Sequence, residues 1–305
     1  MKKVLASILI TMTLILFIPA SKARAEFTED TDDTFSIVWL SDTQDMSFRK
    51  YGGAMAKMGK WIAENRERLD MRYVVQTGDA VENGAAPKQW QEFETMYDQF
   101  KNDIPYIGVA GNHEVKKNGY LEYLTQPEVL AIPVSQRFRG GESSYTTLEA
   151  DGCKLIIVGI GYGVEKESAP WVEQVLQEHA DYTALLLIHD NLTHSQKFGI
   201  TGKWVFENLV SKCPNIRLVL SGHVCDTSAR QDPIDDNGDG KPDRVVTQMM
   251  YDYQHYKEKC GQLRILQFNT KTHSITVTTY SPVTNRYYRD YWFGNQSTFT
   301  LDHAF

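Results

Sequence analysis

Apolar strands alternate with amphipathic helices from residue 35 to residue 223, and five of the strands end in a polar residue that can bind a metal ion. These five residues are Asp42, Asp79, Asn112, His189 and His223. In open α/β sheets, ligands bind at the carboxyl ends of the strands. We therefore expect the five side chains to converge on one rim of the fold, which strongly limits the folds this chain can adopt.

The spacing of apolar residues predicts the individual elements. In the first part of the chain, strands are expected at 35–40, 72–77 and 105–110, with helices over 51–69 and 88–101. In the second part, strands are expected at 144–148, 154–159, 183–188 and 217–220, with helices over 169–180 and 201–212. The residues after Asp226 favour mostly strands. Alternating β and α elements followed by a β-rich tail are typical of a layered α/β domain.

The first 25 residues have the layout of a secretory signal peptide. A basic start precedes an apolar run over 4–20, and small residues in an A-x-A arrangement predict cleavage after Ala25. A transmembrane anchor is the alternative, although the run is at the short end of what a bilayer requires. The expected mature protein is secreted or periplasmic and bound to no membrane, with a polar lead-in at 26–34 and one domain at 35–305.

The charge of the chain limits its partners. The net charge is −7, and removal of the leader, which holds four cations and no acid, would leave −11. Because contacts to nucleic-acid phosphates require clustered cations, we expect no nucleic acid as a large partner. A small phosphate-ester substrate is compatible with this charge if metal ions supply the positive charge. The sequence does not indicate an oligomeric state.

Four cysteines are too few and too scattered for a disulfide scaffold or a C-x-x-C zinc site: Cys153, Cys213, Cys225 and Cys260. An oxidising compartment would permit one or two disulfides. Cys213 stands before a predicted strand and Cys225 stands after it. The roughly six extended residues between them, at roughly 3.3 Å each, place the two cysteines about 20 Å apart. Disulfide Cα separations stay below about 7 Å, which argues against this pair and leaves Cys153 or Cys260 open as partners.

Five short motifs follow the predicted strands in order: Asp42-Thr43-Gln44, Gly78-Asp79-Ala80-Val81-Glu82-Asn83, Gly111-Asn112-His113-Glu114, a single His189 and Gly222-His223-Val224-Cys225. Together they resemble the motif set of the calcineurin-like metallophosphoesterases, which is D-x-H, G-D-x-x-D/N, G-N-H-E/D, a lone H and G-H-x-H. Each motif alone is weak, whereas the ordered set is specific. The resemblance implies an α/β fold of two mixed β-sheets packed as a sandwich and flanked by helices.

The resemblance also implies a phosphoesterase that hydrolyses phosphate mono- or diesters through a metal-bridging hydroxide, and the leader at 1–25 predicts that this enzyme is exported. Two divalent or trivalent transition metal ions (Zn, Fe or Mn), roughly 3.5–4 Å apart, would bind the phosphoryl oxygens and acidify a water. In the family pattern, Asp79 touches both ions and Asp42 belongs to the first site. Asn112, His189 and His223 complete the second site. His113 resembles the residue that protonates the leaving group or stabilises its developing charge.

Two departures from the family pattern fall in the first metal site. Gln44 replaces the His of D-x-H, and Cys225 replaces the last His of G-H-x-H. The candidate ligands there are Asp42, Asp79, the amide oxygen of Gln44 and a thiolate from Cys225. A thiolate is soft and would favour zinc or iron over manganese or magnesium.

Alternatively, Cys225 ligates weakly and the first ion is loosely held or absent. The loss of both imidazoles therefore motivates a second hypothesis, a catalytically weakened phosphate- or ligand-binding relative with an altered first metal site.

A separate segment is rich in oxygen side chains. Asp235, Asn237, Asp239 and Asp243 occupy positions 1, 3, 5 and 9 of a loop with glycine at position 6, which is typical of calcium loops. Val246 stands where a bidentate Glu would close an EF-hand. A plain hairpin turn rich in Asp, Asn and Gly fits the segment equally well. Calcium is thus a further candidate ion, with a role in making the loop rigid.

Overall fold

The computed structural model describes residues 33–116, 120–124, 126, 129, 131–288, 291–292 and 295–305. The signal peptide expected at 1–25 lies outside the described residues, as does most of the polar lead-in. In the part of the chain that is described, no helix combines the length and apolar character needed to cross a bilayer.

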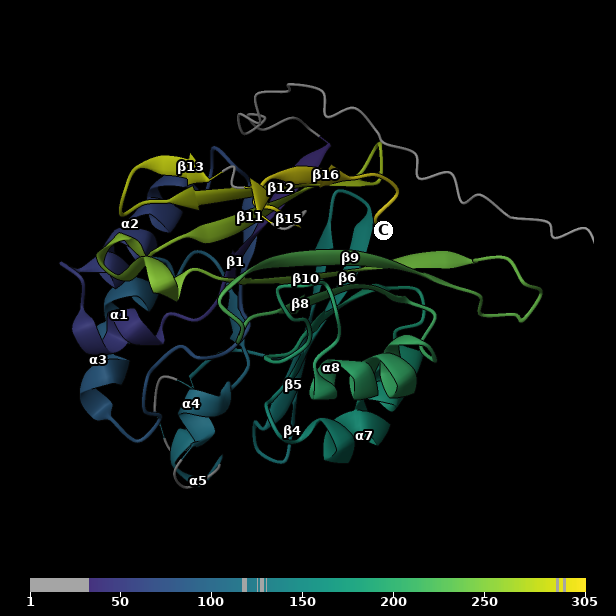
Figure 1. Ribbon diagram of the computed structural model, residues 1–305, viewed down its shortest axis with the longest axis horizontal. Helices are drawn as coiled ribbons and strands as arrows, with labels where there is room; N and C mark the ends of the chain where they lie inside the picture. Colours follow the sequence, from purple (N-terminus) through teal and green to yellow (C-terminus); the bar gives the residue numbers. More distant parts are fainter. Residues whose placement is uncertain are drawn as a thin grey trace, which may run out of the picture.

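The first of two large mixed sheets has the strand order β13-β12-β11-β1-β2-β3, with β16 also paired to β12 (Figure 1). Its strands are β1 (Thr34–Leu40), β2 (Met71–Gln76), β3 (Tyr106–Gly108), β11 (Leu263–Asn269), β12 (Ser274–Ser281), β13 (Arg286–Tyr288) and β16 (Phe299–Leu301). Strands β1, β2 and β3 are parallel, and β11 is antiparallel to β1. The carboxyl ends of β1, β2 and β3 therefore share one edge.

The second sheet has the order β4-β5-β6-β7-β8-β10-β9. Its strands are β4 (Gln136–Phe138), β5 (Ser143–Ala150), β6 (Cys153–Ile160), β7 (Thr183–Leu187), β8 (Ile216–Ser221), β9 (Asp226–Ile234) and β10 (Arg244–Asp252). Strands β6, β7, β8 and β10 are parallel, and β9 forms a long antiparallel hairpin with β10. A small ribbon joins β14 (Tyr291–Trp292) to β15 (Asn295–Gln296).

Helices cover the outer faces of both sheets, which gives four layers (Figure 1). The first sheet is covered by α1 (Gln44–Arg49), α2 (Ala54–Asn65) and α3 (Pro87–Tyr97). The second is covered by α7 (Glu165–Glu178) and α8 (Ile200–Val205), which runs into a π-helical turn at Phe206–Val210. The short helices α4 (Asn112–Val115) and α5 (Tyr120–Tyr123) follow β3. The expected sandwich of two mixed sheets flanked by helices is confirmed.

The central strands are buried on both faces because each sheet has a neighbour on either side. Along β1, Val38 and Leu40 pack with the α2 and α3 side chains, whereas Ile37 and Trp39 enter the core between the two sheets. This alternation follows from the two-residue period of a strand. The sheets therefore pack firmly face to face, and the loops at their carboxyl edges have a fixed base.

The two sheets are assembled from different parts of the chain. The first sheet combines residues 34–108 with residues 263–301, because β11 inserts beside β1 and pairs Thr34 with Asn269. All strands of the second sheet come from residues 136–252. The second sheet is thus an insertion between the two halves of the first.

The structure corrects three helix predictions. The helix expected over 51–69 is α2, and a separate six-residue helix, α1, precedes it. Helix α7 begins at Glu165, four residues before the predicted start, and holds Pro170 in its interior. The helix expected over 201–212 ends as α8 at Val205 and continues in the π-helical turn. The predicted strands 35–40 to 217–220 agree with the observed ones within two residues at each end.

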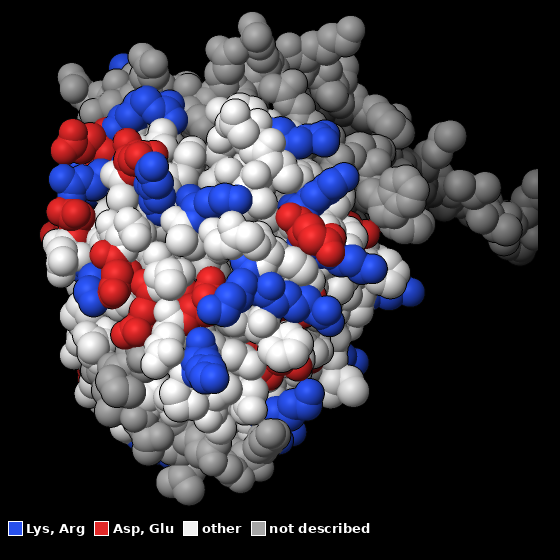
Figure 2. All heavy atoms as spheres, turned by 90° about the vertical axis from the view of Figure 1, so that its left-hand side faces the viewer, with Lys and Arg blue, Asp and Glu red and all other residues white. Residues whose placement is uncertain are grey.

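The face over α1, α2 and α3 carries interspersed charges of both signs (Figure 2). Salt bridges join several of these charges, including Lys50–Glu92 at 3.0 Å and Lys60–Glu64 at 3.6 Å. Glu92 is buried, whereas both side chains of the Lys60–Glu64 pair are exposed, and an exposed pair contributes at most about 1 kcal/mol. This side of the molecule therefore presents a mixed surface rather than a field of one sign.

Candidate metal centre

The five strand-end residues converge, as the sequence predicts. Asp42 follows β1, Asp79 follows β2, and Asn112 begins α4 just after β3. His189 and His223 follow β7 and β8 of the other sheet. The Nε2 atom of His189 lies 3.2 Å from Asp79 Oδ2, and the His223 N–H donates to Asp42 Oδ1 over 3.1 Å. Both sheets therefore contribute to one centre.

Three of the converging residues adopt the left-handed backbone region that side chains with a Cβ usually avoid. The φ angles are 51° at Asp42, 49° at Asp79 and 74° at His223. Each such residue costs on the order of 1–3 kcal/mol, and such residues cluster at functional sites. The strain turns each side chain sharply inward directly after its strand.

Two glycines allow the strand-end loops to approach closely. A Cβ added at Gly111 would overlap the carboxylate of Asp79, and one at Gly222 would overlap the carboxylate of Asp42. Any larger residue would therefore displace a carboxylate of the centre. The glycines in the G-N-H-E and G-H-V-C motifs thus have a steric explanation in this chain.

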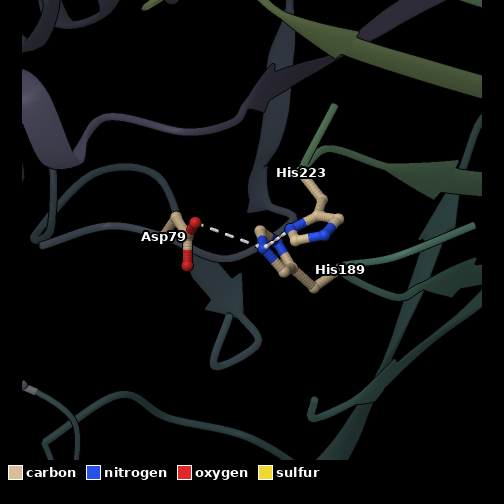
Figure 3. A group of neighbouring side chains, drawn as sticks. All are labelled: Asp79, His189 and His223. Carbon is tan, nitrogen blue, oxygen red and sulfur yellow. Dashed lines mark hydrogen bonds and ion pairs between the residues drawn. The ribbon is translucent and has the colours of Figure 1, made fainter. Parts of the chain in front are cut away.

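One half of the centre, called here the imidazole position, consists of Asp79, Asn112, His189 and His223. Asn112 Oδ1 lies 2.9 Å from His189 Nε2 and 2.9 Å from His223 Nδ1. The ligand atoms of Asp79, His189 and His223 lie within 4.8 Å of one another, and Figure 3 shows these three side chains pointing toward one another. Lone pairs of oxygen and nitrogen atoms face each other here, so a proton or a metal ion must lie among them. The donor set fits a transition metal ion.

The buried ring of His189 is oriented by the backbone. Its Nδ1 lies 2.9 Å from the carbonyl oxygen of Thr77, which accepts the Nδ1–H hydrogen bond and leaves Nε2 facing the centre. This is the outer hydrogen bond that metal-binding histidines usually make. Although burial opposes the charged ring, the adjacent Asp79 carboxylate raises the pKa of His189 to about 10. Burial would raise the pKa of Asp79, but His189 and the backbone N–H of His113 hold it below its ordinary value.

The other half, called here the carboxylate position, contains Asp42 and Gln44 beside Asp79. Asp42 is 3% exposed and accepts a hydrogen bond from the Ser41 hydroxyl at 2.5 Å. Burial, followed by repulsion from Asp252, raises the pKa of Asp42 well above its usual range. Gln44 is buried at the start of α1, where its Nε2 donates to Asp79 Oδ2 over 3.3 Å. Its Oε1 has no hydrogen-bond partner within the described residues.

Cys225 lies at the edge of this position and contacts a carboxylate that the sequence analysis did not identify. Its thiol donates to Asp252 Oδ2 over 3.2 Å. Asp252 is fully buried at the end of β10, and the backbone N–H and side-chain amide of Gln254 each donate to it over 2.7 Å. Partial burial of the thiol and the Asp252 carboxylate raise the pKa of Cys225 to about 12. Asp252 is an acidic residue at the end of an apolar strand in the strand-rich tail, which is the signal that could have identified it.

His113 lies beside the metal-binding side chains and is 22% exposed. Its Nδ1 lies 2.9 Å from a carboxylate oxygen of Glu82, and its Nε2 lies 3.8 Å from Asp79 Oδ2. Its backbone N–H donates to Asp79 Oδ1 over 3.0 Å. Glu82 therefore orients the imidazole, and this role was also not predicted.

Glu114 joins two loops of the centre. Its buried carboxylate accepts backbone hydrogen bonds from Asp79 at 3.0 Å, Val81 at 2.8 Å and Gly111 at 2.7 Å. Burial, with repulsion from Asp79, raises the pKa of Glu114 to about 8. Since three donors on two loops share this one side chain, Glu114 fixes the position of Asp79 relative to Asn112.

All four cysteines are free thiols, so no disulfide forms, and the argument against Cys213–Cys225 agrees with the structure.

The candidate calcium loop joins β9 to β10. There, Asp235 accepts hydrogen bonds from the backbone of Gly238 and Gly240, each at 2.7 Å. Asp243 similarly accepts from Asp236 at 2.8 Å. These contacts describe a hairpin turn, and calcium binding by Asp235, Asn237, Asp239 and Asp243 stays a prediction.

Comparison with known proteins gives a consistent result. The family model described as calcineurin-like phosphoesterase matches residues 35–226, which is more than half of the chain. The chain is 34% identical over 279 residues to the uncharacterized protein YvnB of Bacillus subtilis (strain 168), with 88% of this chain and 22% of that protein covered. It is 24% identical over 214 residues to a probable cyclic nucleotide phosphodiesterase of Moraxella catarrhalis (strain BBH18), covering 63% of this chain and 71% of that one.

Among solved structures, a purple acid phosphatase from yellow lupin (Lupinus luteus) seeds superposes with a TM-score of 0.59 at 12% sequence identity. The match covers 88% of this chain and 54% of the lupin enzyme. At this identity the similarity establishes the fold alone. The chain spans about a fifth of the Bacillus relative and about half of the lupin enzyme.

Proposed function

The chain belongs to the calcineurin-like phosphoesterase family, and from this premise we propose that it is an exported, metal-dependent hydrolase of phosphate mono- or diesters. The observation that carries the proposal is the imidazole position, where Asp79, Asn112, His189 and His223 present a ligand set for a transition metal ion. A small phosphate ester is the proposed substrate. Export rests on the leader at 1–25, and the absence of a large nucleic-acid partner rests on the net charge of −7.

Bound metal ions in such a centre supply positive charge to the phosphoryl oxygens and lower the pKa of a water. The residues of this chain would do the rest. Asp79 and Asp42 would keep the site negative enough to retain cations beside an anionic substrate. In the reaction, the oxygen of water bonds to phosphorus, the ester P–O bond breaks, and the leaving oxygen needs a proton. His113 would donate that proton from Nε2, because Glu82 holds Nδ1 on the other side of the ring.

The test is hydrolysis of a chromogenic aryl phosphodiester by the purified protein, with and without chelator, and with added zinc, iron or manganese. We expect turnover that chelator abolishes and that Asp79→Ala reduces by about 1,000-fold or more, since metal ions supply several kcal/mol of transition-state stabilisation. Asp98→Asn, which alters only a surface pair with Lys101, is the matched control. A folded, metal-loaded protein that hydrolyses neither mono- nor diesters would refute the proposal.

The carboxylate position favours one alternative, a phosphate- or ligand-binding relative with weakened catalysis. The specific observation is that Gln44 and Cys225 stand where the family pattern has two histidines, and that the Cys225 thiol hydrogen-bonds Asp252. Such a protein would bind inorganic phosphate in a metal-dependent manner and would not turn over. Calorimetric titration with phosphate, run beside the hydrolysis assay, distinguishes the two functions.

A further inference from the structure

The carboxylate position contains a buried amide oxygen that lacks a partner. Gln44 is 2% exposed, and its Nε2 contacts Asp79 at 3.3 Å, so the amide group lies against the carboxylate that both ions would share. Its Oε1 makes no hydrogen bond within the described residues. A buried amide oxygen without a partner is unfavourable, and a cation at this place would satisfy it.

Three buried carboxylates surround the same region, and only Asp79 has a basic side chain as a partner. Asp42 is 3% exposed, Asp79 is 2% exposed and Asp252 is fully buried. In the described part of the chain, no lysine or arginine forms a salt bridge with any of the three, and the histidines pair only with Asp79. Since buried charges are normally paired or bound to metal, this region requires positive charge beyond an ion in the imidazole position.

The Cys225 sulfur is turned toward protein rather than toward the shared carboxylate. Its hydrogen bond goes to Asp252, and Asp252 is itself fixed by both amide groups of Gln254. His223, two residues before Cys225 in the chain, donates its backbone N–H to the carboxylate of Asp42. The donor atoms left for a cation are therefore oxygens, from Asp42, Asp79 and Gln44.

We propose that the carboxylate position is an oxygen-only site for a hard divalent cation such as Mn²⁺ or Mg²⁺, bound by Asp42, Asp79 and the amide oxygen of Gln44. Asp252 acts as a positioning residue that holds the Cys225 thiol away from the ion. Oxygen ligands suit these cations, whereas the imidazole position suits zinc or iron. The centre would then hold two different metals. The purpose of this site rests on the proposed function, whereas its test measures only metal binding and does not.

The experiment loads the purified, metal-free protein with one equivalent of Zn²⁺, then titrates Mn²⁺ and follows free Mn²⁺ by electron paramagnetic resonance. We expect one Zn²⁺ and one Mn²⁺ per chain. Gln44→Leu should weaken Mn²⁺ binding at least tenfold and leave the zinc bound. Gln44→Glu keeps an oxygen and adds charge, so it should bind Mn²⁺ at least as tightly as the unaltered protein. Loss of Mn²⁺ in both variants would overturn the assignment of Gln44 as a ligand.

A second measurement tests the sulfur directly. Co²⁺ bound by a thiolate gives a charge-transfer band in the near ultraviolet. When the metal-free protein is fully loaded with Co²⁺, we expect no such band. Cys225→Ser should retain Mn²⁺ within about twofold, with Cys213→Ser as the distant control. A thiolate band that disappears in Cys225→Ser, together with loss of the second ion, would overturn the proposal in favour of a soft sulfur site.

The outcomes separate this inference from the proposed function. If the protein hydrolyses esters in a chelator-sensitive manner but binds only one ion, the oxygen-only site is refuted and the hydrolase remains. If it binds Zn²⁺ and Mn²⁺ as expected but hydrolyses no ester, the site is supported and the proposed function fails.

Discussion

The imidazole and carboxylate positions lie side by side and share Asp79, yet the protein builds them differently. At the imidazole position, two histidines and Asn112 contact one another directly, and Thr77 fixes the orientation of His189. At the carboxylate position, the buried oxygens of Asp42 and Gln44 lie near a thiol that bonds elsewhere. One half of the centre thus keeps the imidazole side chains of the family pattern, while the other half presents mainly oxygen atoms.

The largest expected effect comes from breaking the imidazole position. His189→Ala removes a ligand and the group that pairs with Asp79, so we expect loss of the zinc-type ion and a fall of about 1,000-fold in kcat/KM. Metal analysis after dialysis and the aryl phosphodiester assay measure both quantities. His303→Ala, near the chain end, should leave both unchanged. Retention of the ion in His189→Ala would mean that the two positions are less distinct than their geometry indicates.

Glu114→Ala tests whether both positions depend on the loops that meet at Glu114. Removing three backbone hydrogen bonds lets Asp79 move relative to Asn112, and outer contacts of this kind change metal affinity by about 10- to 100-fold. Competition with a chromophoric chelator gives the affinities. Because Asp79 is shared, we expect both ions to weaken together. If only one ion binds more weakly, Glu114 supports only the position that holds this ion.

The pH dependence of zinc binding should distinguish the positions. Asp79 raises the pKa of metal-free His189 to about 10, so zinc must displace a proton there at neutral pH. The ion pair stabilises the metal-free fold fully below the ordinary imidazole pKa and is lost as pH rises toward 10. Zinc affinity should therefore rise about tenfold per pH unit between about pH 7 and pH 9. Calorimetry in buffers of different ionisation enthalpy measures the released proton, and His189→Gln should abolish its release.

The smallest expected effect comes from placing a nitrogen ligand at the carboxylate position, which would make it more like the imidazole position. Cys225→His places an imidazole where Asp252 can accept its N–H, so a second zinc ion should bind more tightly and zinc-supported hydrolysis should rise several-fold. Metal analysis and the ester assay provide the measurements. If hydrolysis stays absent despite two bound zinc ions, the result supports the binding relative instead of the hydrolase.

The sequence predicted the parts of the centre that depend on strand ends. Asp42, Asp79, Asn112, His189 and His223 each follow an apolar strand, and parallel strands of one sheet end at a common edge. That rule requires only local patterns. The functional roles of these residues, and that of His113, stay predictions.

The residues that were not predicted depend on tertiary structure. Asp252 reaches the centre because β10 lies parallel to β8, a pairing that no local pattern specifies. Glu82 reaches His113 through the shape of a loop. Gln44 was a predicted ligand, but the helix that begins at it was not predicted, because six residues are too few to show helical periodicity in the sequence. Contacts across loops, and between strands that are not consecutive in the chain, thus have no local signature in the sequence.

The insertion of one sheet between the halves of the other has a consequence for the order of folding. Strand β1 cannot gain its partner β11 until the chain has been made as far as Asn269, by which point the whole inserted sheet exists. Pairing over such separations is slow because a long loop must close first. His189 and His223 can therefore form a unit early, whereas Asp42 and Asp79 join them late. We expect refolding to show a slow phase that coincides with the capture of the ions.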